Sequence, residues 1–272
     1  MTMKKYKYLI TRRITQSGIL FLFLGGNIFH WKILRGNLSS ASVFNTVPLS
    51  DPFAALQNLF AGAVLTKEHI TGALIIFLFY AVIGGRLFCG WVCPVNMVTD
   101  TANKLRDIFR FDNLFHSWNI DRVTRYWVAG LSLVLSAIFG VAAFEWISPI
   151  GLLNRGIIYG MGLGWALVIA VFLFDLFAVK NGFCGHLCPL GSFYALTGRL
   201  GFLRIGYDKN KCTLCMKCLD ICPEKQVLQI VGKKSGAVLS AECVNCGRCI
   251  EVCQEHAMQF SNIYSYKTIN NK

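Results

Sequence analysis

The positions of the cysteines constrain this chain more than any other feature of its sequence. All 12 cysteines among its 272 residues fall into four tight groups. Two groups near the C-terminus share the spacing C-x2-C-x2-C-x3-C, and Pro223 follows the first where Gln254 follows the second. The first run consists of Cys212, Cys215, Cys218 and Cys222, and the second consists of Cys243, Cys246, Cys249 and Cys253.

This spacing is typical of bacterial ferredoxins, in which three thiolates of a run hold one [4Fe–4S] cluster and the fourth cysteine reaches the other cluster. The crossover predicts cluster I at Cys212, Cys215, Cys218 and Cys253, and cluster II at Cys222, Cys243, Cys246 and Cys249. Structural zinc prefers separated C-x2-C pairs, and disulfides need an oxidising compartment. We therefore predict that these eight cysteines are iron ligands.

The apolar residues lie mostly in the first two hundred positions. The chain is 54% hydrophobic, yet the sequence after Arg204 is polar. A bilayer-spanning helix needs about 20 apolar residues, and three windows approach that length, with a shorter fourth near the N-terminus. The windows are Ser17–Trp31, Ile70–Phe88, Tyr126–Trp146 and Ile157–Val179. They predict four transmembrane helices, with a cleaved signal peptide as the alternative for the first window.

Lysine and arginine are distributed unevenly around these windows. Of the 27 basic residues, 23 fall in the stretches 1–16, 86–125 and 180–272. The positive-inside rule then places these stretches, both termini and the cysteine runs in the cytoplasm of a bacterium, with the chain a multi-pass protein of the inner membrane. Basic residues beside anionic lipid also account for the net charge of +13 without nucleic acid.

An internal repeat contains the other four cysteines. Phe88–Pro94 (FCGWVCP) recurs as Phe183–Pro189 (FCGHLCP), and Asp51-Pro52 and Ser148-Pro149 precede the two copies. Aspartate or serine followed by proline is typical of a helix start, so each half should open a short helix. The pattern predicts a duplicated two-span unit whose copies have the same orientation.

The repeat predicts a second type of metal or redox site. A symmetry axis would bring Cys89, Cys93, Cys184 and Cys188 together as ligands of a third iron–sulfur cluster. Zinc, copper(I) and a redox-active dithiol are alternatives, because soft thiolates suit all of them, and the cysteines could also be purely structural.

Titratable residues in or beside the apolar windows are candidates for proton transfer, because burying a charge is costly there. Asp175 and His30 are our candidates for a proton or quinol site, and Asp51 and Glu145 are expected at the outer face of the membrane. Arg86 is expected to reach lipid headgroups instead. The windows contain no second histidine to pair with His30 in binding haem.

With both cysteine signatures, the chain resembles the NapH family, ferredoxin-type membrane subunits of the periplasmic nitrate reductase system. The resemblance implies a quinol dehydrogenase role, in which electrons from menaquinol or ubiquinol pass to the polyferredoxin NapG and on to nitrate reductase. Oxidoreductase activity would then require partner subunits. The alternatives are a CcoG-like or NosR-like protein for copper handling or oxidase and reductase maturation, and a passive membrane anchor for a ferredoxin.

The expected architecture has three parts. An α-helical membrane domain covers residues 1–203, a small α+β ferredoxin domain with two clusters covers 204–262, and a polar tail covers 263–272.

Overall fold

The computed structural model describes residues 6–109, 120–160, 162 and 164–262, so the expected tail 263–272 lies outside the described residues. The chain divides into two compact units. The first unit comprises residues 1–15, 79–92 and 194–272, and the second comprises 16–78 and 93–193. Three helices contribute residues to both units: α1 (Lys7–Ile28), α3 (Lys67–Ile83) and α10 (Pro189–Thr197).

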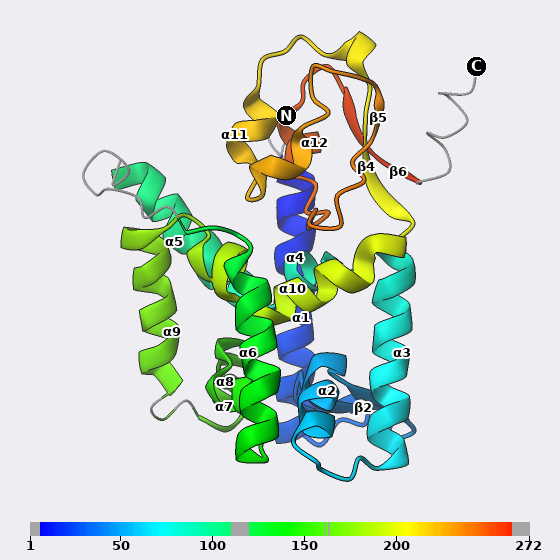
Figure 1. Ribbon diagram of the computed structural model, residues 1–272, viewed down its shortest axis with the longest axis vertical. Helices are drawn as coiled ribbons and strands as arrows, with labels where there is room; N and C mark the ends of the chain where they lie inside the picture. The colour runs from blue at the N-terminus through cyan, green and yellow to red at the C-terminus, as the bar shows by residue number, and fades with distance from the viewer. Residues whose placement is uncertain (1–5, 110–119, 161, 163, 263–272) are drawn as a thin grey trace. The chain divides into compact units, whose positions relative to one another are not determined.

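The first unit contains a small antiparallel sheet (Figure 1). Its strands are β4 (Leu203–Tyr207), β5 (Gly236–Ala237) and β6 (Met258–Asn262), in the order β5-β4-β6. Strands β4 and β6 pair along their whole length, from Leu203 opposite Asn262 to Tyr207 opposite Met258. Residues of the sheet and of the segments around it form one buried hydrophobic cluster, namely Ile205, Tyr207, Val227, Leu228, Val238, Cys249, Ala257 and Met258.

Short helices complete the first unit. The α-helices are α4 (Leu87–Trp91), α11 (Lys217–Ile221) and α12 (Arg248–Val252), and the 3-10 turns are η5 (Gly198–Leu200), η6 (Lys209–Lys211) and η7 (Lys225–Leu228). Helices α11 and α12 pack against each other, and α12 also contacts β6. The C-terminal part of the unit is thus of the α+β type.

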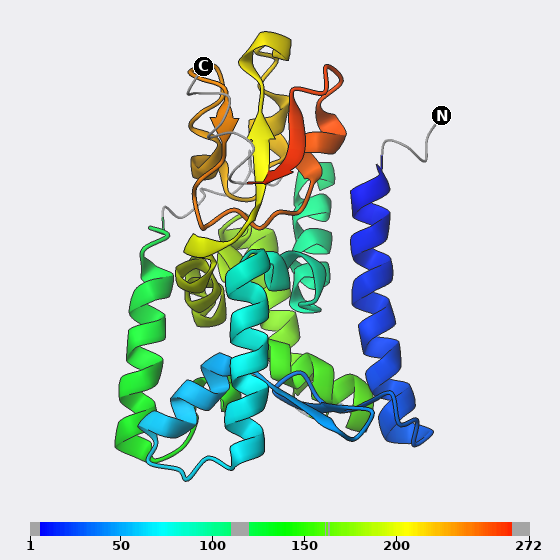
Figure 2. The ribbon, with the colours of Figure 1, turned by 90° about the vertical axis from the view of Figure 1, so that its right-hand side faces the viewer.

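The second unit is mainly helical. It contains a meander of three short strands, β1 (Leu34–Gly36), β2 (Ser40–Val43) and β3 (Val47–Ser50), drawn in blue in Figure 2. Its α-helices are α2 (Pro52–Phe60), α5 (Val95–Phe109), α6 (Thr124–Phe139), α7 (Ala143–Ile147), α8 (Pro149–Tyr159) and α9 (Gly164–Leu173). Two π-helical segments follow, η3 (Phe174–Ala178) and η4 (Phe183–Leu187).

The two halves of the repeat start alike. Asp51 caps α2 and accepts a hydrogen bond from the Phe53 N–H, and Ser148 caps α8 and accepts one from the Gly151 N–H. Proline is the first helical residue in both cases. The predicted short helices after Asp51 and Ser148 are therefore confirmed.

The prediction of four transmembrane helices, and with it the duplicated two-span unit, is wrong. Within the described residues, no helix combines the length and the apolar composition needed to cross a bilayer. The physical reason is that the apolar windows form helices that are short, interrupted or polar in one half. Gly140, with φ of 65°, ends α6 after 16 residues, and α3 has 17 residues, about 26 Å at 1.5 Å per residue.

The fourth window is interrupted as well, and the first forms a helix with a polar N-terminal half. Gly160, with φ of 94°, ends α8 inside the fourth window, and α9 has only 10 residues before the backbone changes to the π-helical η3. Helix α1 is longer, at 22 residues, but its N-terminal half contains Arg12, Arg13 and Gln16. Glycine with a positive φ is a common helix terminator, so the ends of α6 and α8 follow from the sequence.

Candidate iron–sulfur sites

The two C-terminal cysteine runs bend in the same way. In both runs, the residues on either side of the second cysteine have left-handed backbone. Their φ angles are 56° at Leu214, 59° at Met216, 50° at Asn245 and 75° at Gly247. Three of these residues carry a side chain, which makes this conformation unfavourable. Such strain persists where the surroundings enforce it, often at functional sites. Helices α11 and α12 then begin and carry the third cysteine of each run.

Four cysteines line a first cavity of about 70 Å³ in this unit. Tyr207 and Met258 of the sheet, together with Val231, form apolar parts of its wall. The cysteines are Cys212, Cys215, Cys218 and Cys253. They are the set predicted for cluster I, with three members from the first run and one from the second.

The other four cysteines line a second cavity. Ile205, Val227 and Leu228 contribute apolar side chains to its wall. The cysteines are Cys222, Cys243, Cys246 and Cys249, the set predicted for cluster II. The structure therefore brings together each predicted set of four, including the exchange of the fourth cysteine, while iron ligation itself stays a prediction.

The chemistry of these thiols fits an iron–sulfur cluster in each cavity. Burial raises the pKa of Cys243 to about 12 and also raises that of Cys249. A buried thiolate therefore needs a cationic partner, which iron would supply. Backbone N–H groups already face two sulfurs: Leu214 N lies 3.4 Å from Cys212 Sγ, and Ala257 N lies 3.3 Å from Cys253 Sγ. All twelve cysteines are free of disulfides.

Single-ion sites are a separate matter. Among the residues that the structure describes, no three histidine, cysteine, aspartate or glutamate side chains are grouped closely enough to hold one metal ion.

A buried ion pair adjoins the second cavity. Arg86 Nη1 lies 2.7 Å from Glu224 Oε1 and 2.8 Å from the Glu242 carbonyl oxygen, and Arg86 and Glu224 are only 2% and 3% exposed. The expectation that Arg86 reaches lipid headgroups is therefore wrong. The sequence carries no local signal for this pair, because 138 positions separate the two residues.

The first C-x3-C-P copy contacts the second cysteine run. The Trp91 indole N–H donates to the Asn245 carbonyl oxygen at 3.0 Å. A Cβ placed on Gly90 would lie 2.9 Å from Val244 Cγ1 and 3.0 Å from the Val244 carbonyl oxygen. Arg12, which is buried, donates to the Gly90 carbonyl oxygen at 2.9 Å. Glycine at position 90 therefore permits a close backbone approach.

The second copy adjoins Asp175. Asp175 is fully buried in η3, and its Oδ1 accepts a hydrogen bond from the Phe183 N–H at 2.8 Å. Burial raises the pKa of Asp175 to about 6, and hydrogen bonds from Phe183 and Thr99 act against the shift. Thr99 Oγ1 also lies 3.4 Å from Cys184 Sγ. The predicted proton role of Asp175 is thus compatible with its surroundings but stays a prediction.

Three C-x3-C-P cysteines interact within the second unit. Burial raises the pKa of Cys184, and nearby Cys93, Asp175 and Cys188 raise it further. Cys93 and Cys188 are buried. Cys89 belongs to the first unit. A third cluster at these four positions stays a prediction.

His30 has a different environment from Asp175. It follows the end of α1, its side chain is exposed and its backbone is left-handed, with φ of 56°. Its carbonyl oxygen accepts a hydrogen bond from Arg35 Nη2 at 2.8 Å. No contact between described residues joins His30 to Asp175, and its role in a quinol site stays a prediction.

Comparisons with known proteins agree with the cysteine geometry. A 4Fe-4S binding domain matches residues 69–112 and 157–207, which contain the two C-x3-C-P copies, and a 4Fe-4S dicluster domain matches residues 204–254. The ferredoxin-type protein NapH of Escherichia coli is 44% identical over 83% of this chain and 78% of its own length.

The chain belongs to the NapH family of ferredoxin-type proteins. NapH of Haemophilus influenzae is 42% identical over 96% of this chain and 91% of its own length. The methylamine utilization ferredoxin-type protein MauN of Methylorubrum extorquens is 42% identical, with coverages of 87% and 82%. No solved structure matches. The chain is therefore a NapH-like ferredoxin-type electron-transfer protein with [4Fe–4S] sites.

Proposed function

We propose that this chain takes electrons from a quinol of the menaquinol or ubiquinol type and passes them through iron–sulfur clusters to a partner protein. The observation that carries the proposal is the pair of apolar cavities, each lined by four cysteines, within one unit. A quinol releases two electrons and two protons when it is oxidised. An iron–sulfur centre can take these electrons one at a time.

The partner we propose is a NapG-like polyferredoxin that delivers electrons to a periplasmic nitrate reductase. The support is the identity to NapH proteins, which is 42–44% over most of the chain. Relatives named for methylamine utilization are similar to nearly the same degree. The role of this chain as an electron donor is therefore better supported than nitrate reductase as the final acceptor. These names do not favour the copper-handling alternative.

Reduction by quinol tests the proposal directly. Protein purified without oxygen would be mixed with menadiol, a naphthoquinol without a long tail, and cluster reduction would be followed by visible absorbance and EPR. We expect menadiol to reduce clusters that dithionite also reduces. Protein reduced by dithionite but never by menadiol or a short-chain ubiquinol would contradict the quinol role. Adding a NapG-type partner then tests onward transfer.

We also propose that the chain works at the bacterial inner membrane. Helix α3 exposes an apolar stripe at a spacing of four residues, formed by Ile70, Leu74, Leu78 and Val82, each about half exposed. A contiguous apolar surface of this kind favours contact with lipid or with a partner. Recovery of the protein in the membrane fraction after a high-salt wash would support this location, and release into the wash would contradict it.

A further inference from the structure

A large cavity in the second unit lies outside the cysteine sites. Its volume is about 780 Å³, within the range of about 300–1,000 Å³ that small-molecule sites occupy. Helix α2 contributes Asn58 to its wall, α7 contributes Glu145 and Trp146, and α8 contributes Arg155 and Tyr159. Two charged groups and two large aromatic side chains therefore meet at one cavity.

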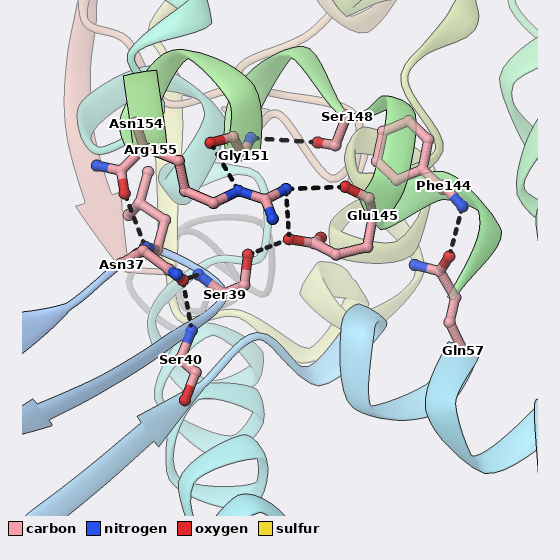
Figure 3. A network of polar contacts seen from close by, with 11 residues as sticks. Asn37, Ser39, Ser40, Gln57, Phe144, Glu145, Ser148, Gly151, Asn154 and Arg155 are labelled. Atoms are coloured by element: carbon pink, nitrogen blue, oxygen red, sulfur yellow. Dashed lines mark hydrogen bonds and ion pairs between the residues drawn. The ribbon is translucent and has the colours of Figure 1, made fainter. Parts of the chain in front are cut away.

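The charged groups are held in place by a polar network (Figure 3). Arg155 Nη2 donates to the Glu145 carbonyl oxygen at 3.1 Å and lies 3.7 Å from Glu145 Oε1, and Arg155 Nε donates to the Gly151 carbonyl oxygen at 3.3 Å. The Ser39 hydroxyl donates to Glu145 Oε1. In the described part of the chain, each of these carboxyl contacts engages Oε1 rather than Oε2, and Glu145 lines the cavity.

A second carboxyl group lies close to Glu145. Burial raises the pKa of Asp51 to about 7, and the charge of Glu145 contributes to the shift. Burial also raises the pKa of Glu145. Ser39 links the two residues, because its carbonyl oxygen accepts a hydrogen bond from the Asp51 N–H at 3.0 Å and its hydroxyl contacts Glu145. A proton acceptor, Glu145, thus lines the cavity, and Asp51, whose pKa is raised to about 7, lies next to Glu145.

The aromatic side chains select among ligand types. Trp146 and Tyr159 are 74% and 66% exposed, and both line the cavity. Aromatic rings of this kind favour a flat, largely apolar ring as a ligand. Because Glu145 and Arg155 neutralise each other, the site offers no net charge to an anion or a cation. A neutral aromatic diol satisfies the aromatic rings, the carboxylate and the guanidinium together.

We propose that this cavity binds the head group of the quinol, with Glu145 Oε2 accepting the proton of one hydroxyl and Arg155 holding the oxygen that remains. This inference rests on the proposed quinol function. Oxidation of one quinol breaks two O–H bonds and gives a quinone. Glu145 takes the first proton, passes it to Asp51 and then takes the second, and the two electrons leave singly to iron–sulfur clusters of the chain.

Three variants of the full-length protein test the site. Glu145→Gln keeps the acceptor for Ser39 but cannot take a proton, so menadiol should reduce the clusters about a hundredfold more slowly. Trp146→Ala should weaken binding of menadione, followed by calorimetry, about tenfold. Trp127→Ala is the matched control, because Trp127 is 76% exposed on α6 and does not line the cavity. Dithionite should reduce all three variants as it reduces the original protein.

The possible results distinguish a wrong binding site from a wrong quinol function. If Glu145→Gln and Trp146→Ala bind menadione and react with menadiol like the Trp127→Ala control, the quinol binds elsewhere and the site is wrong, while the quinol function stands. If the unsubstituted protein neither binds menadione nor is reduced by menadiol, although dithionite reduces it, both proposals are wrong. Slower reduction of Glu145→Gln with unchanged menadione binding supports the assigned proton role.

Discussion

The C-terminal cysteine runs and the two C-x3-C-P copies contain the same reactive group but arrange it differently. Each C-terminal run bends through left-handed residues, and its cysteines line cavities within a single unit. The C-x3-C-P cysteines lie at short helical segments, α4 and η4, and two of the four are buried. In the first case, spacing along the chain already groups three of the four cysteines of each set, whereas in the second the grouping depends on how distant segments pack.

The largest expected effect comes from removing a C-terminal cysteine. Cys249→Ser should lower the iron content by about four atoms per chain, the content of one cubane. It should also expose residues 204–262 to protease, because a small metal-containing domain owes much of its stability to its metal. Iron analysis and limited proteolysis measure both effects. Leu239→Ser, at an exposed position of the same region, should change neither.

The next prediction asks whether the C-x3-C-P copies behave like the C-terminal runs. If they hold a third cluster, the protein should contain about 12 iron atoms, and Cys184→Ser should contain about 8. The EPR signals of the two C-terminal clusters should persist in that variant. About 8 iron atoms in both proteins would instead assign Cys184 to thiol chemistry or structure, and the two kinds of motif would then differ in function as well as in geometry.

Breaking the buried ion pair beside the second cavity should have a smaller effect. Arg86→Met leaves Glu224 charged and buried, which should lower the free energy of unfolding by about 3 kcal/mol. Lys180→Met is the control, because Lys180 pairs with Asp107 at 2.6 Å but both side chains are about half exposed. Its effect should stay below about 1 kcal/mol. Similar losses in urea unfolding would contradict the role given to burial.

The sequence predicted local features better than long-range ones. The spacing of the cysteines predicted the two sets of four that line the cavities, because three members of each set are close in sequence and the ferredoxin pattern supplies the exchange of the fourth. Asp51-Pro52 and Ser148-Pro149 predicted helix starts, because a cap depends on neighbouring residues. The transmembrane helices were predicted wrongly, since mean hydropathy does not register a helix break such as Gly140 or Gly160. The Arg86–Glu224 pair and the contact between Arg155 and Glu145 depend on packing that no local pattern encodes.

The pH dependence of stability tests the surroundings of the second C-x3-C-P copy. The pKa of Asp175 is raised to about 6 in the folded protein, so folding favours its protonated form. Its contribution to stability is present at pH 4 and is lost as the pH rises through about 6. Asp175→Asn removes this ionisation and can still accept the hydrogen bond from Phe183.

Melting temperatures between pH 5 and pH 8 provide the measurement for Asp175. We expect Asp175→Asn to gain stability relative to the unsubstituted protein as the pH rises through this range. The effect should be smaller than that of Arg86→Met, because hydrogen bonds from Phe183 and Thr99 already stabilise the ionised form. A constant difference between the two proteins would show that Asp175 does not titrate here, and unchanged pH dependence of quinol oxidation would remove it from the proton path.

The smallest expected effect concerns Gly90, where the first C-x3-C-P copy meets the second cysteine run. Gly90→Ala would place a methyl group 3.0 Å from the Val244 carbonyl oxygen, so the two segments must move apart, at a cost of about 1 kcal/mol. Gly130→Ala in α6 is the matched control, because its Cβ would meet no atom within 4 Å. Alanine favours helix there, so this variant should gain about 0.5–1 kcal/mol in free energy of unfolding.

Urea unfolding of the two glycine variants measures both changes. A loss of stability at position 90 with a gain at position 130 would show that close packing, rather than flexibility, requires glycine beside Cys89. A gain at both positions would mean that the first copy is not held against the cluster II cysteines, and the link between the two kinds of motif would be lost.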